Sequence, residues 1–381
     1  KVSLSNAQLT DSSFRIDVPI NAGDGSISLS ETGIYPVAIS LTTPGKSTSK
    51  TRYSFTTYLP NVAADGSAYS QKLNVVPLLI FDPLIDRKKL VEDNGNIVKN
   101  NTTKFQNASE AIKQIDTLNA QSSLVVSPET LENASILATI SSQDSVADLF
   151  NVTPANMQYV QDTYVPLNIA ELEKVNKTGT FSDFMALGRT ITGDLGYSIP
   201  SRTLVTQAFT KKTIPVIAKS GTDNIVVDDR IFGSKKSPTQ RPAKITDGDL
   251  SLSVAAGEYK FVNSIPNSLS KNARANYLIA ATSVIALEAP SVSRGAIIPL
   301  DLSALDPTVV TTFVEAISNN PLTQTVKLDQ FFSDLDEDKN LSSQLNKFSI
   351  SDNQIKKIDE DQVNEVRKYS LAGESIYPST S

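Results

Sequence analysis

Carboxylates that directly follow runs of apolar residues are the side chains in this sequence best suited to chemistry. Asp82, Asp228 and Asp301 each occupy such a position. Two carboxylates can hydrolyse a glycosidic bond when they lie about 5–5.5 Å apart (retention of configuration) or about 6.5–9.5 Å apart (inversion). We therefore predict that Asp82, paired with Asp228 or Asp301, forms a candidate catalytic pair.

Other polar side chains at predicted strand ends are candidates for ligand binding. They are Asp86, Glu129, Asn168, Asp229, Arg230 and Asp247, with Glu171 and Asp249 beside them. A structural interpretation competes, because Asp-Pro, Asp-Asp and Asp-Gly pairs such as Asp82-Pro83 and Asp247-Gly248 are common in turns and caps. For any single carboxylate the sequence favours the turn or cap.

Aromatic residues could line a groove on which sugars stack, although scattered aromatics more often belong to the core. The candidates are Tyr159, Tyr164, Tyr197, Tyr259 and Phe261.

The residue types that are absent exclude several kinds of active site. The sequence has no His, no Cys and no Trp. Without His there is no Ser-His-Asp triad and no His-ligated zinc, which argues against zinc-dependent deacetylation. We predict no cofactor and no metal. The acidic stretch 334–340 copies the one-three-five spacing of a calcium loop, but it lacks the Gly at position six and has Leu345 in place of the final Glu.

Charge and hydropathy exclude two classes of partner. There are 35 basic and 41 acidic residues, a net charge of −6, and the isoelectric point is near 5.0. Nucleic-acid binding needs clustered Lys and Arg, so we predict no nucleic-acid partner. No stretch approaches the roughly 18 consecutive apolar residues of a membrane span.

The elements that must position these residues change character near residue 70. Alternating apolar residues at 14–18, 26–30, 33–41 and 51–60 predict antiparallel strands, part of a β-sandwich over 1–70. Over 71–334, buried strands alternate with helices, which predicts an α/β fold, a β/α barrel. A polar tail, 335–381, contains one amphipathic helix at 353–369. The predicted barrel strands are 75–81, 123–128, 164–169, 213–217, 224–229, 243–246, 250–255, 295–300 and 325–328, and the helices are 109–118, 129–140, 170–177, 181–194, 273–289 and 307–318.

Several short motifs, taken in order, resemble the landmarks of an uncharacterised family of actinobacterial envelope proteins. The most extended is Pro-Leu-Leu-Ile-Phe-Asp-Pro-Leu-Ile-Asp-Arg at 77–87. The resemblance covers roughly 34–332. One departure is Ile80-Phe81, where the family commonly has a Trp. The other segments are 33–37, 55–60, 125–131, 164–167, 276–290 and 294–299, with Pro321 and Leu328.

This resemblance implies a fold and a location. Family members are typically exported and tethered by a C-terminal membrane helix, and their genes often lie beside that of a lipid II flippase. Their central domain resembles a distorted glycoside hydrolase/deacetylase barrel, for which no activity is established. Because the sequence starts at Lys1 without Met, we expect an extracytoplasmic piece of a parent whose signal peptide and anchor lie outside it.

Three functions are compatible with these observations. The first is a non-catalytic, hydrolase-like barrel in the cell envelope that binds a cell-wall glycan or an envelope protein. The second is an active carboxylate-dependent glycoside hydrolase acting on a cell-wall polysaccharide. The third is a structural spacer, which predicts a barrel mouth that is filled or flat.

Overall fold

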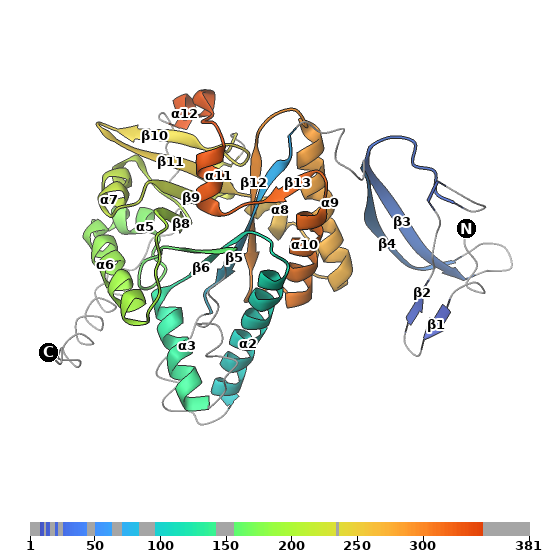
Figure 1. The fold of residues 1–381 in the computed structure, drawn as a ribbon, viewed down its shortest axis with the longest axis horizontal. Coiled ribbons are helices and arrows are strands. Elements are labelled where there is room, and N and C mark those ends of the chain that lie inside the picture. Colours follow the sequence, from blue (N-terminus) through green and yellow to red (C-terminus); the bar gives the residue numbers. More distant parts are fainter. Residues whose placement is uncertain are drawn as a thin grey trace.

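The computed structural model of the chain describes residues 8–10, 13–15, 20–21, 26–43, 50–62, 71–83, 96–141, 156–233 and 236–345. Within these residues a large, mostly parallel sheet forms the centre of the molecule, with helices around it (Figure 1). Two small antiparallel sheets precede it in the chain. The predicted tail helix at 353–369 lies outside the described residues.

Seven parallel strands of the large sheet form a nearly closed ring. They are β5 (Leu73–Phe81), β6 (Ser122–Val126), β7 (Met157–Val160), β8 (Thr203–Thr206), β9 (Asn224–Asp228), β11 (Leu250–Gly257) and β12 (Gly295–Asp301). They follow one another around the ring in chain order, and β12 pairs with β5. This arrangement confirms the predicted distorted β/α barrel.

The ring consists of two halves joined by narrow junctions. Strands β7, β6, β5 and β12 form the β5 half, and β8, β9 and β11 form the β9 half. Between β7 and β8 the pairing is a single bridge, Gln161 to Leu204. Between β11 and β12 it is the single pair Gly257 and Ile297. By contrast, β5 and β12 pair over seven residues of each strand.

Each half is covered by its own helices and its own hydrophobic cluster. Helices α2 (Asn96–Thr117), α9 (Lys271–Glu288) and α10 (Pro307–Asn319) pack on the β5 half, in a cluster that contains Ile112, Leu278 and Phe313. The β9 half packs against α5 (Ile169–Lys174), α6 (Thr178–Asp194) and α7 (Ile214–Lys219). Parallel strands covered on both faces are expected to be continuously apolar, as β5 is.

A third hydrophobic cluster fills the interior of the ring. It joins residues of both halves, such as Val76 and Val226, to Leu328 and Phe331 of α11 (Leu328–Asp334). The preceding strand β13 (Thr323–Thr325) pairs with the start of β5, which places α11 at the amino ends of the strands. The barrel is therefore closed at this end, and a fully buried Phe of this kind contributes about 3–5 kcal/mol relative to Ala.

The remaining elements lie at the edges of the barrel. Strand β10 (Ala243–Asp247) is antiparallel to β11, and helix α12 (Lys339–Leu345) packs on it. Helices α3 (Pro128–Ser141) and α8 (Tyr259–Asn263) follow β6 and β11. No described helix is both long enough and apolar enough to cross a membrane.

The N-terminal region is antiparallel, as predicted. Strands β3 (Gly33–Thr43) and β4 (Lys50–Asn61) form a long hairpin, and β1 (Gln8–Thr10) pairs with β2 (Ser13–Arg15). The expected strand at 26–30 is reduced to one bridge at Ile27. The hairpin contacts the barrel through Tyr58, whose ring packs edge-on against Tyr277 of α9 at a centroid distance of 5.8 Å.

Three predicted barrel strands are wrong, and a Pro explains two of the errors. Residues 164–168 form a loop, since Pro166 cannot donate to a sheet and Asn168 caps α5. Residues 214–219 are helix α7, with Pro215 in its first turn, where a missing N–H costs nothing. The true strands there are the four-residue β7 and β8. Near the end, β13 stops at Thr325 and Leu328 begins α11.

Candidate functional site

A cavity of about 990 Å³ opens at the carboxyl ends of the ring strands. It takes residues from both halves, because all seven strands point their carboxyl ends to this side. Its mouth is hollowed, which does not fit the prediction for a structural spacer. The polar residues that line it are Asp82, Asp162, Asn168, Glu171, Thr206, Gln207, Asp228, Arg230, Tyr259, Asn263, Asn267, Arg274 and Asp301.

Asp82, directly after β5, is held by two hydroxyl groups from the next strand-to-helix turn. Ser127 Oγ and Thr130 Oγ1 each lie 2.9 Å from Asp82 Oδ1. Both hydroxyl-bearing residues are buried at the start of α3. Since hydroxyl groups carry no charge, the carboxylate is oriented without being neutralised.

Asp162, two residues after β7, is the most perturbed acid at the cavity. Its pKa is raised from 3.8 to about 7, chiefly by burial and to a smaller extent by the charge of Asp82. The backbone N–H of Thr163, 2.7 Å from Oδ1, opposes this shift. Near neutral pH this carboxyl group is therefore protonated for about half of the time.

Asp301 ends β12 on the other side of Asp82. Its Oδ1 accepts a hydrogen bond of 2.8 Å from the backbone N–H of Ser303, as in an ordinary turn. Within the described part of the chain, none of Asp82, Asp162 and Asp301 forms an ion pair with Lys or Arg. The β5 half thus brings three carboxylates without counter-ions to one cavity.

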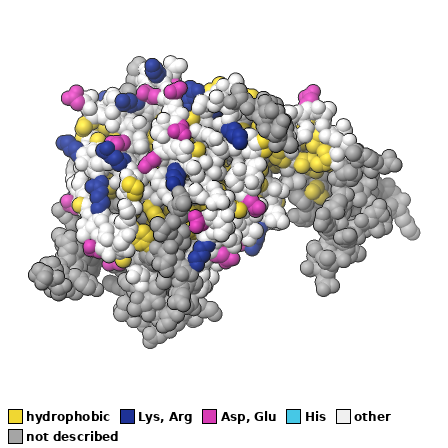
Figure 2. Space-filling view, viewed as in Figure 1, with side chains coloured by type: hydrophobic (Ala, Val, Ile, Leu, Met, Phe, Trp, Pro, Cys, Tyr) yellow, Lys and Arg dark blue, Asp and Glu magenta, His cyan; other side chains and the backbone are white. Residues whose placement is uncertain are grey.

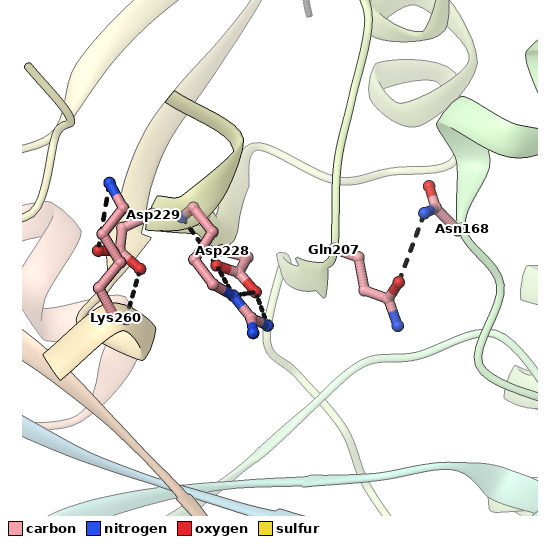
Figure 3. A network of polar contacts seen from close by, with 6 residues as sticks. Asn168, Gln207, Asp228, Asp229 and Lys260 are labelled. Atoms are coloured by element: carbon pink, nitrogen blue, oxygen red, sulfur yellow. Dashed lines mark hydrogen bonds and ion pairs between the residues drawn. The ribbon is translucent and has the colours of Figure 1, made fainter. Parts of the chain in front are cut away.

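The β9 half presents the opposite arrangement, in which carboxylates are paired with cations (Figure 3). Arg230 Nε lies 2.9 and 2.8 Å from the two oxygens of Asp228, and Arg230 Nη2 also contacts Oδ2. The Asp228 oxygens raise the pKa of Arg230 through these hydrogen bonds. Arg230 also lies 5.9 Å from the centroid of the Tyr259 ring, within cation–π range.

Asp229 faces away from the cavity and fixes the start of α8. It is buried and accepts a hydrogen bond of 2.9 Å from the backbone N–H of Lys260, whose Nζ lies 3.9 Å away. Burial raises the pKa of Asp229, and the Lys260 contacts oppose that shift. Asp229 therefore supports the element that carries Tyr259 and does not line the cavity.

Amide side chains join α5 to the end of β8. Asn168 caps α5 by accepting a 3.1 Å hydrogen bond from the backbone N–H of Ala170. Its Nδ2 donates to Glu171 at 3.1 Å and, at 3.5 Å, reaches Gln207 (Figure 3). These groups complete the wall between β7 and β9.

The structure brings together several of the predicted site residues and separates others. Asp82, Asn168, Asp228, Arg230 and Asp301 line the cavity. Of the predicted aromatic residues, Tyr259 lines it, while Tyr159 and Tyr197 pack against each other elsewhere.

Two further predicted positions lie elsewhere, and a third is not described. Asp247 is the last residue of β10 and pairs with Leu250, at the amino end of β11 and so at the opposite edge of the barrel. Glu129 is in the first turn of α3 and is not among the lining residues. Asp86 is outside the described residues.

Sequence reasoning missed Asp162, Gln207, Asn263, Asn267 and Arg274. The first two follow β7 and β8, the short strands that the pattern did not reveal. Recognition of 157–160 as a strand would have selected Asp162 by the rule that reacting groups follow strands. The other three lie beyond β11, in or near helices, and no strand-end rule selects them.

A zinc site of the deacetylase kind does not fit these residues, because the chain has no His. Among the described residues, no group of three or more acidic side chains is arranged to hold a metal ion. The polar groups that line the cavity are carboxyl, amide, hydroxyl, guanidinium and phenol groups.

Comparison with known proteins shows the fold. No protein-family model and no curated protein matches the chain. A putative polysaccharide deacetylase from Mycobacterium smegmatis aligns with a TM-score of 0.51 and 9% identity, covering 76% of this chain and 95% of that one. A 4-alpha-glucanotransferase from Thermococcus litoralis aligns with a TM-score of 0.49 and 14% identity, covering 68% of this chain.

The chain spans only 38% of that glucanotransferase. A GH57-type branching enzyme from Thermococcus kodakaraensis, solved with glucose, aligns with a TM-score of 0.48 and 10% identity, over 70% of this chain and 72% of that enzyme. At such low identity the match to the putative deacetylase supports the fold alone. The barrel is of the glycoside hydrolase/deacetylase type, as the resemblance implied, whereas membership of the actinobacterial envelope family stays a prediction.

Proposed function

We propose that this protein is a cell-envelope module that binds a glycan in the cavity at the carboxyl ends of its barrel. The observation that carries the proposal is the composition of that cavity. Acceptors (Asp82, Asp301), donors (Asn263, Arg274) and the ring of Tyr259 converge on one opening. Carbohydrate hydroxyl groups both donate and accept hydrogen bonds, and the apolar face of a sugar packs on an aromatic ring.

Binding is preferred to catalysis because of the state of the predicted catalytic residues. Asp228 is bound through both of its oxygens by Arg230, so a cation of the protein already occupies them. Asp82 is fixed by two hydroxyl groups. A binding site needs only such oriented acceptors, whereas a hydrolase needs two carboxyl groups at a defined separation on either side of the scissile bond.

Oligosaccharide binding tests the proposal directly. Titration calorimetry with cell-wall oligosaccharides is expected to show binding that Tyr259→Ala weakens about 10-fold. Among the described residues that line the cavity, Tyr259 has the only aromatic ring. Tyr164→Ala is the matched control, because Tyr164 packs near Phe184 and donates to Glu132 outside the cavity. Equal affinity of both variants, or no binding by the native protein, contradicts the proposal.

Hydrolysis of a cell-wall polysaccharide is the second candidate, and one observation favours it. Asp162 has the raised pKa of a general acid and lies within the electrostatic influence of Asp82. In this mechanism Asp162 donates its proton to the glycosidic oxygen. Asp82 or Asp301 then attacks the sugar or activates water.

Product analysis separates the two candidates. If the protein is a hydrolase, reducing ends appear during incubation with polysaccharide, and Asp162→Asn abolishes them while the exposed Asp194→Asn does not. Stable binding without new reducing ends supports the binding module.

The extracytoplasmic location rests on the family resemblance, and so does the expected anchoring of the parent by a C-terminal membrane helix. An envelope protein is the alternative partner. Cell fractionation with an antibody to this barrel, followed by protease treatment of intact cells, tests the location. Protection of the barrel inside intact cells contradicts it.

A further inference from the structure

Three donor side chains at one corner of the cavity have no partner. Asn263 ends α8, Asn267 follows it, and Arg274 lies in the first turns of α9. Within the described part of the chain these side chains form no hydrogen bond or ion pair, and Arg274 Nε is inaccessible to solvent without an acceptor. A buried donor without an acceptor, such as Arg274 Nε, is uncommon and costs about 1–3 kcal/mol. Asn263 and Asn267 line the cavity but are exposed to solvent.

The two arginines of the cavity differ in whether a carboxylate pairs with their positive charge. The charge of Arg230 is neutralised by Asp228 through a bidentate contact. Arg274 has no carboxylate within ion-pair distance among the described residues. Arg274 is also close to the amino end of the 18-residue helix α9, where the helix dipole favours an anion.

The corner lies away from Asp162 along the ring. Asn263, Asn267 and Arg274 follow β11, whereas Asp162 follows β7, three strands away, and Asp82 follows β5, two strands away. Asp301 lies nearer, at the end of the neighbouring strand β12. An anionic group is therefore repelled by the carboxylates on β5, β7 and β12 and attracted only at Arg274. This asymmetry favours one orientation of a ligand that carries a negative charge at one end.

We propose that Asn263, Asn267 and Arg274 bind an oxyanion substituent of the glycan, a carboxylate or a phosphate. The inference rests on the proposed glycan binding and names the class of ligand, an acidic glycan. A guanidinium group matches a carboxylate or phosphate with two parallel hydrogen bonds, and the two amides donate to the remaining oxygens. A neutral acceptor satisfies the donors but leaves the positive charge of Arg274 without compensation.

A three-ligand comparison tests this assignment. Titration calorimetry uses oligosaccharides of matched length that are neutral, carry a uronate, or carry a phosphate. Arg274→Met is expected to weaken binding of the acidic oligosaccharide about 10- to 100-fold, the loss of one charged hydrogen-bonding group. Binding of the neutral one is expected to weaken less, because it loses a hydrogen bond but no charge interaction. The tighter of the uronate and phosphate ligands identifies the source of the oxyanion.

Two matched variants complete the experiment. Arg274→Lys keeps the positive charge but lacks the parallel N–H donors of the guanidinium group. It is therefore expected to retain part of the affinity for the acidic ligand. Arg202→Met removes an exposed arginine that pairs with Asp223 outside the cavity, and it is expected to leave all affinities unchanged.

The outcomes distinguish this inference from the proposed function. Equal native affinities for neutral and acidic oligosaccharides, or no specific effect of Arg274→Met, overturn the inference and leave glycan binding intact. Absence of binding by every ligand overturns both. Preferential loss of the acidic ligand supports both.

Discussion

The two halves of the barrel place carboxylates at the same cavity but treat their charge differently. In the β9 half, Asp228 and Asp229 are paired with Arg230 and Lys260. In the β5 half, Asp82 and Asp162 are held by uncharged donors. A strand-end position alone therefore does not define a role. The available counter-ion decides whether a carboxylate fixes the structure or stays free to titrate and to bind.

The largest effect is expected from the pH dependence of the β5 half. The pKa of Asp162 is 3.8 unfolded and about 7 folded, so the folded protein binds more protons between these values. The free energy of unfolding therefore falls as pH rises through this range, by at most about 4 kcal/mol. Asp162→Asn is expected to remove this part of the pH dependence. Urea unfolding at pH 4.5 and pH 8 measures the unfolding free energy of both proteins.

The control for this prediction is Asp194→Asn, at the exposed end of α6. Burial raises the pKa of Glu258 to about 7. Glu258 is present in both proteins and therefore contributes equally to their pH dependence. A pH dependence that Asp162→Asn leaves unchanged contradicts the titratable character of the β5 half.

A smaller effect is expected from the buried pair in the β9 half. Asp229→Ala leaves the backbone N–H of Lys260 without its acceptor and is expected to cost about 2 kcal/mol of unfolding free energy. Asp223→Ala, which breaks an exposed ion pair with Arg202, is expected to cost less than about 1 kcal/mol. Chemical denaturation at pH 7 compares the two variants, and similar losses refute a structural role for Asp229.

A hydroxyl that orients Asp82 is expected to contribute less again. Thr130→Val keeps the shape of the side chain and removes the hydrogen bond to Asp82, for an expected cost of about 1 kcal/mol. Thr190→Val, on the exposed face of α6, is expected to stay within about 0.5 kcal/mol of the native protein. Thermal unfolding of both variants measures the difference, and no difference rules out the orienting hydrogen bond.

The smallest stability effect is expected at Arg230, although its contacts with Asp228 are the most numerous. The guanidinium side chain is 57% exposed, so solvent screens the pair. Arg230→Met is expected to lower the unfolding free energy by less than about 1 kcal/mol at low salt, and by less at high salt. A loss above 2 kcal/mol that salt does not alter shows that the pair is effectively buried.

The sequence predicted the barrel where its strands are long and apolar. The continuous apolar runs of β5 and β12 indicated strands buried on both faces. Strands β7 and β8 have four residues each, too few to show a period. Because β7 was missed, so was Asp162.

Two other features of the site depend on tertiary contacts and have no local sequence signal. The raised pKa of Asp162 arises from burial and from Asp82, a residue 80 positions away in the sequence. Arg274 lies in a helix, and only the packing of α9 on the β5 half of the barrel brings it to the cavity. Its unpaired guanidinium cannot be inferred from the residues around it.

The narrow junctions of the ring have a mechanical consequence. Each half has its own hydrophobic cluster, and one pair of residues joins the strands at each seam. Rocking of one half against the other would change the width of the mouth, and the interior cluster that joins both halves would resist it. A sugar chain that contacts both Asp82 and Tyr259 would link the two halves and restrict this motion. Amide hydrogen exchange at Leu204 and Ile297 should then slow on binding.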